Sequence, residues 1–216
     1  MDASKVLFDK VYTPQPKKIK LYHASNAIKR VKDIYFPGPR GTCDFGRGFY
    51  LTDNYKIAEE WICYDNTPII NIYDYEKDDD EILYLENEEY IRVVVGCRSQ
   101  RYKINFKSNI IHGIIANDRI DRAMPSFLDG TIGDKCLLEL LSLGFLGVQY
   151  MFRQHTGTLK YIDSYQLQSF SLSDAINRKN YKRNVVNDQY RKVLRKDFKN
   201  QKYVEDYLHM GDYDEV

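Results

Sequence analysis

The segment Gly46-Arg47-Gly48-Phe49-Tyr50-Leu51-Thr52 is the most informative part of this 216-residue chain, because two other segments complement it. Leu21-Tyr22-His23-Ala24-Ser25 lies upstream, and Gly147-Val148-Gln149-Tyr150-Met151-Phe152 lies far downstream. All three segments have the pattern of short apolar strands. If these strands converge, one slot is lined by three side chains, His23, Tyr50 and Gln149. Such a slot suits a flat aromatic group attached to a ribose.

Length and composition are those of a globular chain. A length of 216 residues fits one domain with a terminal extension and suffices to bury a core. Aromatic residues make up 14%, including 19 tyrosines, so rings are expected to supply much of the packing. The net charge of +1 favours neither nucleic acid nor membrane as a partner. It hides an asymmetry, however: residues 74–90 hold nine acidic side chains and one Lys, whereas residues 178–202 hold ten Lys or Arg and two Asp.

The cysteines and the N-terminus predict a cytoplasmic protein without a metal or a membrane anchor. The four cysteines are widely spaced, which predicts reduced thiols and no zinc site (Cys43, Cys63, Cys97, Cys136). His112 and His209 have no partner at metal-ligand spacing. The segment Met1–Lys5 lacks the apolar core of a signal peptide, and no apolar run is long enough to span a bilayer.

The hydrophobic pattern predicts an α+β organisation rather than a doubly wound parallel sheet. Thr52 or Asp53 is expected to cap a helix that ends at about Ile62, and Asp134 to cap another that ends at Leu143. The acidic run at 74–90 is expected to be a solvated excursion between strands. An alternative is that it pairs with the basic stretch at 178–202 of the same chain. Strands are expected at residues 19–23, 49–51, 90–95, 110–115, 147–152 and 169–172. The expected divisions are a lead-in at 1–18, a central domain at 19–172 and a basic helical extension at 173–216.

In this order, the motifs resemble those of a known superfamily, the ADP-ribosyltransferases. The resemblance is to the His-Tyr-Glu branch, which includes diphtheria toxin and the poly(ADP-ribose) polymerases, and in particular to a bacterial family with a His-Tyr-Gln variant. It covers residues 19–172, and the order and spacing of the motifs are more specific than any motif alone. It implies two small packed antiparallel sheets around a central NAD cleft, with C-terminal helices. The motifs are L-Y-H-A-S from Leu21, D-F-G-R-G-F-Y-L-T from Asp44, A-E-E-W from Ala58 and Q-Y-M-F from Gln149.

The resemblance also assigns roles to single positions. His23 matches the histidine that binds the nicotinamide ribose of NAD, and Tyr50 matches the tyrosine that stacks on nicotinamide. Ala24 stands where the family has a glycine whose backbone grips the nicotinamide amide. Trp61 falls where a second ring completes the sandwich, and Ala58 stands where the polymerases have a serine hydroxyl. Ser25 and Gly48 complete the implied NAD-binding set.

The chemistry of the implied reaction explains these residue types. Breaking the nicotinamide–ribose bond develops positive charge on the ribose, while nicotinamide leaves as a neutral group and needs no proton. The protein must therefore orient NAD and stabilise spreading positive charge. Two aromatic faces suit a pyridinium cation, at about 0.5–2 kcal/mol each.

Gln149 is the main departure from the family pattern, because it stands where the family has glutamate. It can hydrogen-bond a ribose hydroxyl, but it is neutral and cannot act as a general base. This change argues against polymer extension, which needs an activated sugar hydroxyl. Single transfer to an acceptor that is already nucleophilic stays open.

Five further residues are candidates with simpler alternatives. Arg47 can contact the NAD pyrophosphate, because the guanidinium fork fits phosphate, or it can be a solvated loop charge. Asn117, Asp118 and Arg119 follow a strand and can shape the acceptor side, or they can form a turn with a local ion pair. Arg153 is a further acceptor-side candidate. With Gln154 and His155 it follows Gln149 and can replace the absent base, although an exposed loop is the better explanation of His155.

The function implied by the resemblance is mono-ADP-ribosyl transfer from NAD to a protein or nucleic-acid acceptor. NAD is then a substrate, and no recycled cofactor is expected. By family analogy alone, the role is that of a bacterial toxin or defence effector with a neutralising antitoxin as partner. Two other classes stay open: an NAD glycohydrolase with water as the acceptor, and a non-catalytic module that binds NAD, ADP-ribose or nucleic acid. The basic stretch at 178–202 can bind nucleic acid or form a solvated helix face.

Overall fold

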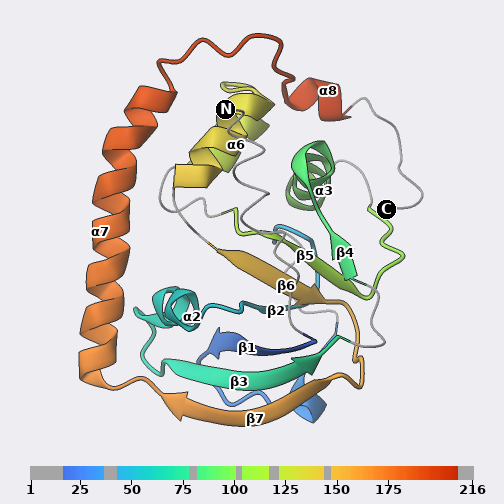
Figure 1. Ribbon diagram of the computed structural model, residues 1–216, viewed down its shortest axis with the longest axis vertical. Helices are drawn as coiled ribbons and strands as arrows, with labels where there is room; N and C mark the ends of the chain where they lie inside the picture. The colour runs from blue at the N-terminus through green and yellow to red at the C-terminus, as the bar shows by residue number, and fades with distance from the viewer. Residues whose placement is uncertain are drawn as a thin grey trace.

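The computed structural model describes residues 17–36, 43–77, 82–100, 104–116, 122–143 and 147–208, which form two β-sheets with helices around them (Figure 1). The elements in chain order are β1 (Lys18–Ser25), the short 3-10 helix η1 (Val31–Asp33), β2 (Phe49–Leu51), α2 (Tyr55–Ile62), β3 (Ile69–Glu76), β4 (Ile82–Tyr84), α3 (Asn87–Ser99), β5 (Ile110–Ile114), α5 (Ala123–Leu128), α6 (Asp134–Leu143), β6 (Val148–Phe152), β7 (Leu159–Gln166), α7 (Ser169–Val193) and α8 (Val204–Leu208).

The two sheets are mostly antiparallel. One has the strand order β1-β3-β7 and the other the order β2-β6-β5-β4. All pairs are antiparallel except β4 with β5, which is parallel. In Figure 1 the β1-β3-β7 sheet lies below the β2-β6-β5-β4 sheet, and α3 and α6 lie above the latter. The α+β expectation is therefore confirmed.

A core between the two sheets joins these layers. It consists of alternating side chains that each strand turns towards the other sheet, because a strand presents every second residue to the same face. Ile19 and Leu21 of β1 meet Phe49 and Leu51 of β2 in this way. Rings contribute much of the packing, as Tyr75 lies 5.4 Å from Phe152 in an edge-on contact. The expected reliance on aromatic side chains is confirmed here.

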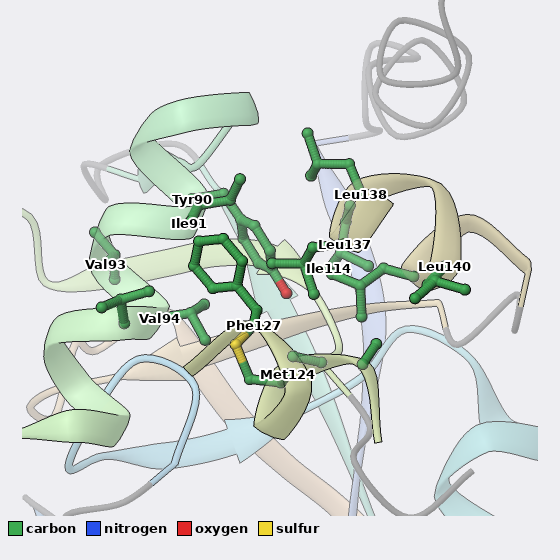
Figure 2. Packing of buried hydrophobic residues seen from close by; sticks show 14 of the residues in the cluster. Tyr90, Ile91, Val93, Val94, Ile114, Met124, Phe127, Leu137, Leu138 and Leu140 are labelled. Carbon is green, nitrogen blue, oxygen red and sulfur yellow. The ribbon is translucent and has the colours of Figure 1, made fainter. Parts of the chain in front are cut away.

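A second core lies on the opposite face of the β2-β6-β5-β4 sheet. There α3, α5 and α6 cover the strands (Figure 2). Figure 2 shows the ring of Phe127 from α5 between the aliphatic side chains of α3 and those of α6. Tyr207 of α8 packs edge-on against Phe127 at 5.7 Å, so the last described helix belongs to this core as well.

Three sequence predictions about elements are wrong. Residues 90–95 form part of α3 and not a strand, because burial of Tyr90, Ile91 and the three valines against α6 outweighs their β-propensity. Residues 169–172 are the first turn of α7. The helix that ends at Ile62 is capped by neither Thr52 nor Asp53, since the Asn54 side chain accepts from the backbone of Lys56 and Ile57.

The acidic run is also not a simple solvated excursion. Its first residues, Asp74 and Glu76, belong to β3, where they form ion pairs with lysines on the neighbouring strands. Lys20 lies 3.3 Å from Asp74, and Lys160 lies 3.2 Å from Glu76. Opposite charges across a strand pair are mildly stabilising, which explains how a charged sequence forms a strand.

The long helix α7 lies along one side of the molecule and runs from the end of β7 towards α6 (Figure 1). The expected boundary at residue 172 lies within this helix. Its basic side chains contact α2: Lys182 lies 2.8 Å from Glu60, and Arg178 forms an ion pair with Glu59. Among the described residues, these glutamates are the main partners of the basic stretch, and Lys202 pairs with Glu88 of the acidic run. Within the described residues, no helix is both long and apolar enough to cross a bilayer.

The close approach of Gly48 to β6 generates the first prediction. A Cβ at Gly48 would lie 2.2 Å from Sδ of Met151 and 2.8 Å from the carbonyl oxygen of Phe152. We expect Gly48→Ala to lower the free energy of unfolding by about 1–3 kcal/mol, because the backbone cannot yield as a side chain can. Gly157→Ala is the matched control, since nothing lies within 4 Å of the added atom. Equal denaturant midpoints for the two variants would contradict this packing.

The buried ion pairs between α2 and α7 generate the second prediction. The Glu60 side chain is 9% exposed and the Lys182 side chain 25%. We expect Glu60→Gln to lower the free energy of unfolding by about 1–3 kcal/mol, because two partly buried cations lose the counter-charge of a buried carboxylate. Glu76→Gln, whose partners lie at the surface, should change it by less than about 1 kcal/mol. Thermal melts of both variants measure the difference, and a loss no larger in Glu60→Gln would contradict it.

Candidate functional site

The candidate site lies where β1 and β2 separate after a single point of contact. Tyr22 and Thr52 exchange two backbone hydrogen bonds, of 2.8 and 3.0 Å, and form an isolated antiparallel bridge. A continuing ladder would next pair Ala24 with Tyr50. The described strands do not pair there. Instead, the imidazole of His23 fills the gap, with Nδ1 2.8 Å from the Tyr50 carbonyl oxygen.

This contact determines the state of His23. A carbonyl oxygen only accepts hydrogen bonds, so Nδ1 carries the proton and Nε2 keeps its lone pair as an acceptor. Burial lowers the pKa of His23 to about 4, and the neighbouring charge of Lys29 acts in the same direction. The ring is therefore neutral at physiological pH. Nε2 has no hydrogen-bond partner within the described part of the chain, and it can accept one from a hydroxyl group.

A buried asparagine on the adjacent strand holds the end of β1 in place. Nδ2 of Asn71 donates to the carbonyl oxygens of His23 (3.3 Å) and Ala27 (3.2 Å), and also to Oγ of Ser25 (3.1 Å). Its Oδ1 accepts from the backbone N–H of Lys29 at 2.8 Å. Ser25 itself donates to the Ala27 carbonyl at 2.6 Å. The Ser25 hydroxyl thus closes the turn after β1, beside His23.

Ala24 presents backbone groups to the gap. β1 is an edge strand, and Tyr22 uses its outward N–H and C=O for the bridge with Thr52. Because a strand repeats every two residues, the N–H and C=O of Ala24 point to the same edge, beyond the bridge. Behind Ala24 lies the buried methyl group of Ala58, in a cluster with Ile70. The gap therefore offers one backbone donor and one backbone acceptor beside Nε2 of His23.

Tyr50 is held firmly in the loop that precedes it. Its hydroxyl donates to the Gly46 carbonyl at 2.7 Å and accepts from the Phe45 N–H at 3.1 Å. Its ring stacks against Phe45, with centroids 6.4 Å apart and an interplanar angle of 26°. Burial raises the pKa of Tyr50 well above its ordinary value, so the phenol stays protonated. The half-buried ring can act as a fixed aromatic surface, but not as an acid or base near neutral pH.

The two glycines of the initial segment have structural explanations. Gly46 has a φ of +80°, a left-handed conformation that favours glycine, and Gly48 lies against β6 as described above. Arg47 between them is exposed. It has no ion pair within the described residues, which leaves its guanidinium available to an anion.

Gln149 is buried on β6, the strand next to β2. Tyr50 pairs with Met151, so Gln149 lies diagonally from Tyr50 on the same face of the sheet. Its Nε2 donates to Oδ2 of Asp44 at 2.6 Å and to the Ile114 carbonyl at 3.3 Å. Both partners are acceptors, which fixes the orientation of the amide. Oε1 has no partner in the described part of the chain and remains an acceptor.

The other candidates divide into two groups. Trp61 is half-buried against Ile57 and Ile115, at the end of the sheet where Gln149 lies. Arg153 lies at the other end of β6, about 13 Å along the strand from Gln149 at 3.3 Å per residue. Its Nη1 donates to the carbonyl oxygens of Phe106 (2.6 Å) and Ser108 (3.1 Å). Arg153 thus braces the loop before β5 through backbone carbonyls. Asn117, Asp118 and Arg119 lie outside the described residues.

Three residues that support the site are not recognised from the sequence. Asp44 begins the D-F-G-R-G block, but nothing in the pattern pairs it with Gln149, 105 positions away. Arg98 and Asn71 belong to other elements and have no motif of their own. In the parts of the chain that the structure describes, no three His, Cys, Asp or Glu side chains group closely enough to hold a metal ion.

The buried histidines generate a prediction about pH. Burial lowers the pKa of both His23 and His112 to about 4, from 6.5 in the unfolded chain. The unfolded chain therefore binds more protons, and stability falls as the pH drops from about 6.5 towards 4. Each histidine contributes up to about 1.4 kcal/mol per pH unit. We expect His23→Asn, which keeps a donor for the Tyr50 carbonyl, to show a shallower loss than the wild type in denaturant unfolding. Identical pH slopes would contradict a neutral His23.

Comparison with known proteins gives one match. Residues 19–163 match the family described as "Protein of unknown function (DUF3990)". No curated protein and no solved structure matches the chain. The matched region includes β1, β2 and β6, and therefore His23, Tyr50 and Gln149. Because it covers well over half of the 216 residues, the chain belongs to the DUF3990 family.

Proposed function

We propose that this protein is a mono-ADP-ribosyltransferase that uses NAD as its donor substrate. One observation carries the proposal: the Nδ1–H of His23 is tied to the Tyr50 carbonyl where β1 and β2 separate. The bond presents a neutral imidazole Nε2 as a hydrogen-bond acceptor beside the free backbone edge of Ala24. The nicotinamide riboside half of NAD requires these groups side by side. Its ribose hydroxyl needs a hydrogen-bond acceptor, and its primary amide needs one donor and one acceptor.

The strand arrangement supports this proposal. The histidine lies on the edge strand of one sheet, while the tyrosine and the glutamine lie on adjacent strands of the other. Strands β1 and β2 of the two sheets share one backbone bridge, and the resemblance to the His-Tyr-Glu branch implies an NAD cleft beyond it. The fold itself is thus consistent with the ADP-ribosyltransferase superfamily.

In the proposed reaction each side chain has a role that its surroundings permit. Nε2 of His23 accepts a hydrogen bond from a hydroxyl of the nicotinamide ribose and orients it. The rings of Tyr50 and Trp61 face the nicotinamide, whose positive charge aromatic faces attract. Oε1 of Gln149 accepts a hydrogen bond from the ribose and stabilises charge as the glycosidic bond breaks. The bond electrons leave with nicotinamide, which departs neutral.

The acceptor in this reaction must supply its own nucleophile. Gln149 has no titratable proton, and the Tyr50 phenol stays protonated, so neither activates a hydroxyl. We therefore propose transfer of one ADP-ribose unit to a macromolecule, protein or nucleic acid, and not polymer extension. A toxin or defence role with a neutralising antitoxin rests on family analogy alone.

NAD turnover by variants of the gap tests the proposal. We expect His23→Ala to lower nicotinamide release by at least about 100-fold and Tyr50→Ala by about 10- to 100-fold, because both orient the donor in the transition state. Phe170→Ala is the matched control, since this ring is 79% exposed on α7 and has no part in the proposed site. Folding of each variant is checked by thermal melting. Wild-type turnover in folded His23→Ala and Tyr50→Ala would refute the mechanism.

The acceptor class is read from the same protein with radiolabelled NAD and a whole-cell lysate. Label that is removed by protease identifies a protein acceptor, and label removed by nuclease identifies a nucleic acid. Nicotinamide release without any labelled macromolecule would replace the proposal by an NAD glycohydrolase. Binding of NAD in calorimetry without consumption would reduce it to a binding module.

A further inference from the structure

The acidic residue of the D-F-G-R-G block is enclosed by four hydrogen-bond donors. Asp44 is 6% exposed, and Oδ1 accepts from Nε of Arg98 at 2.8 Å and also from its Nη2. Oδ2 accepts from the Ala116 N–H at 2.9 Å and from Nε2 of Gln149 at 2.6 Å. Arg98 in turn donates to the Ala116 carbonyl at 2.6 Å. The loop before β2, helix α3 and the end of β5 thus meet at one carboxylate.

This arrangement leaves Gln149 a single free function. Its Nε2 has two hydrogens, which are used on Asp44 and on the Ile114 carbonyl. The bond to an ionised carboxylate is charge-assisted and short, so it holds the amide more strongly than a neutral partner would. Rotation of the amide by half a turn would bring Oε1 against two acceptors. Oε1 is therefore directed away from Asp44 and kept as an acceptor.

We propose that Asp44 is a positioning residue that holds Gln149 with its Oε1 ready to accept a hydrogen bond from the NAD ribose. This inference rests on the proposed function. It also accounts for glutamine at position 149, because a glutamate there would place two carboxylates at hydrogen-bond distance, and like charges at that distance cannot both ionise. The Asp44 carboxylate is neutralised by Arg98 and does not contact the substrate itself. It fixes the orientation of the Gln149 amide, which makes the contact.

The hydrogen bond between Asp44 and Gln149 has either a structural or a positioning role. If it were purely structural, its loss would lower stability without a specific effect on turnover. The pH dependence of turnover separates the two roles. In Gln149→Glu, the introduced carboxyl faces Oδ2 of Asp44 and the Ile114 carbonyl. Only its protonated form can donate to one of them, through its single O–H, and that form again leaves one oxygen as an acceptor. The other titratable neighbours are Cys43, Cys97 and Tyr50. Burial raises the pKa of Cys97 to about 12 and that of Tyr50 well above its ordinary value, so these two stay protonated between pH 5 and 9.

The experiment measures kcat and KM for nicotinamide release from NAD between pH 5 and 9. Asp44→Asn should lower kcat about 10- to 100-fold while KM changes less than about 3-fold, because the Oε1 contact strengthens in the transition state. Gln149→Glu should be most active at low pH and lose activity as its carboxyl ionises, whereas the wild type keeps its activity. Asp174→Asn, an exposed change on α7, is the matched control and should behave as the wild type.

Two results would overturn the inference: wild-type kcat in folded Asp44→Asn, or a Gln149→Glu pH profile parallel to that of the wild type. If Asp44→Asn does not fold, the Gln149→Glu profile carries the test alone. If the wild type releases no nicotinamide, the proposed function fails, but the pairing is still tested by unfolding. The introduced carboxyl then has a raised pKa in the folded state, so Gln149→Glu should lose stability relative to the wild type as the pH rises. A constant difference would refute the pairing itself.

Discussion

The candidate site depends on one short bridge, which joins the edges of two sheets that share a hydrophobic core. Tyr22 and Thr52 share two backbone hydrogen bonds, and one residue further along β1 the His23 imidazole replaces the next pair by capping the Tyr50 carbonyl. An edge strand normally presents a row of unpaired backbone groups, which attract other chains. Here the edge is paired at Tyr22 by the bridge to Thr52, and the next outward position, Ala24, has no strand partner in the described part of the chain. A neutral imidazole lies beside this unpaired position, and these groups carry the proposal of an NAD site.

Buried charge is the second feature that organises the molecule. Two carboxylates with little exposure pair with cations from distant segments. Asp44 pairs with Arg98, and Glu60 pairs with Lys182. A buried charge without a partner is strongly destabilising, so each pair specifies which elements must meet. The first pair ties the loop before β2 to α3 and, through Gln149, to β6. The second attaches the long helix α7 to α2. Charge thus contributes to specificity in places where the aromatic cores alone would tolerate other arrangements.

The strands that carry the candidate site were predictable, and several other elements were not. The strands at β1, β2, β5 and β6 and the helices at α2 and α6 have clear apolar periodicity, and the structure confirms them. β3 and β7 were missed because their outer faces carry charged residues that pair only across strands. The valine-rich part of α3 resembles a strand in isolation. Burial on several sides removes the alternation that distinguishes a half-buried strand, so periodicity could not separate the two.

By itself the sequence determined the α+β class and the strands that carry His23, Tyr50 and Gln149, because apolar alternation and glycine placement are local properties. Only the tertiary structure decided what those side chains are bonded to. The tautomer of His23 depends on a carbonyl 27 residues away, and the orientation of Gln149 depends on a carboxylate 105 residues away. No local pattern encodes such pairs, since hydrogen bonds between distant segments arise only when packing brings the segments together.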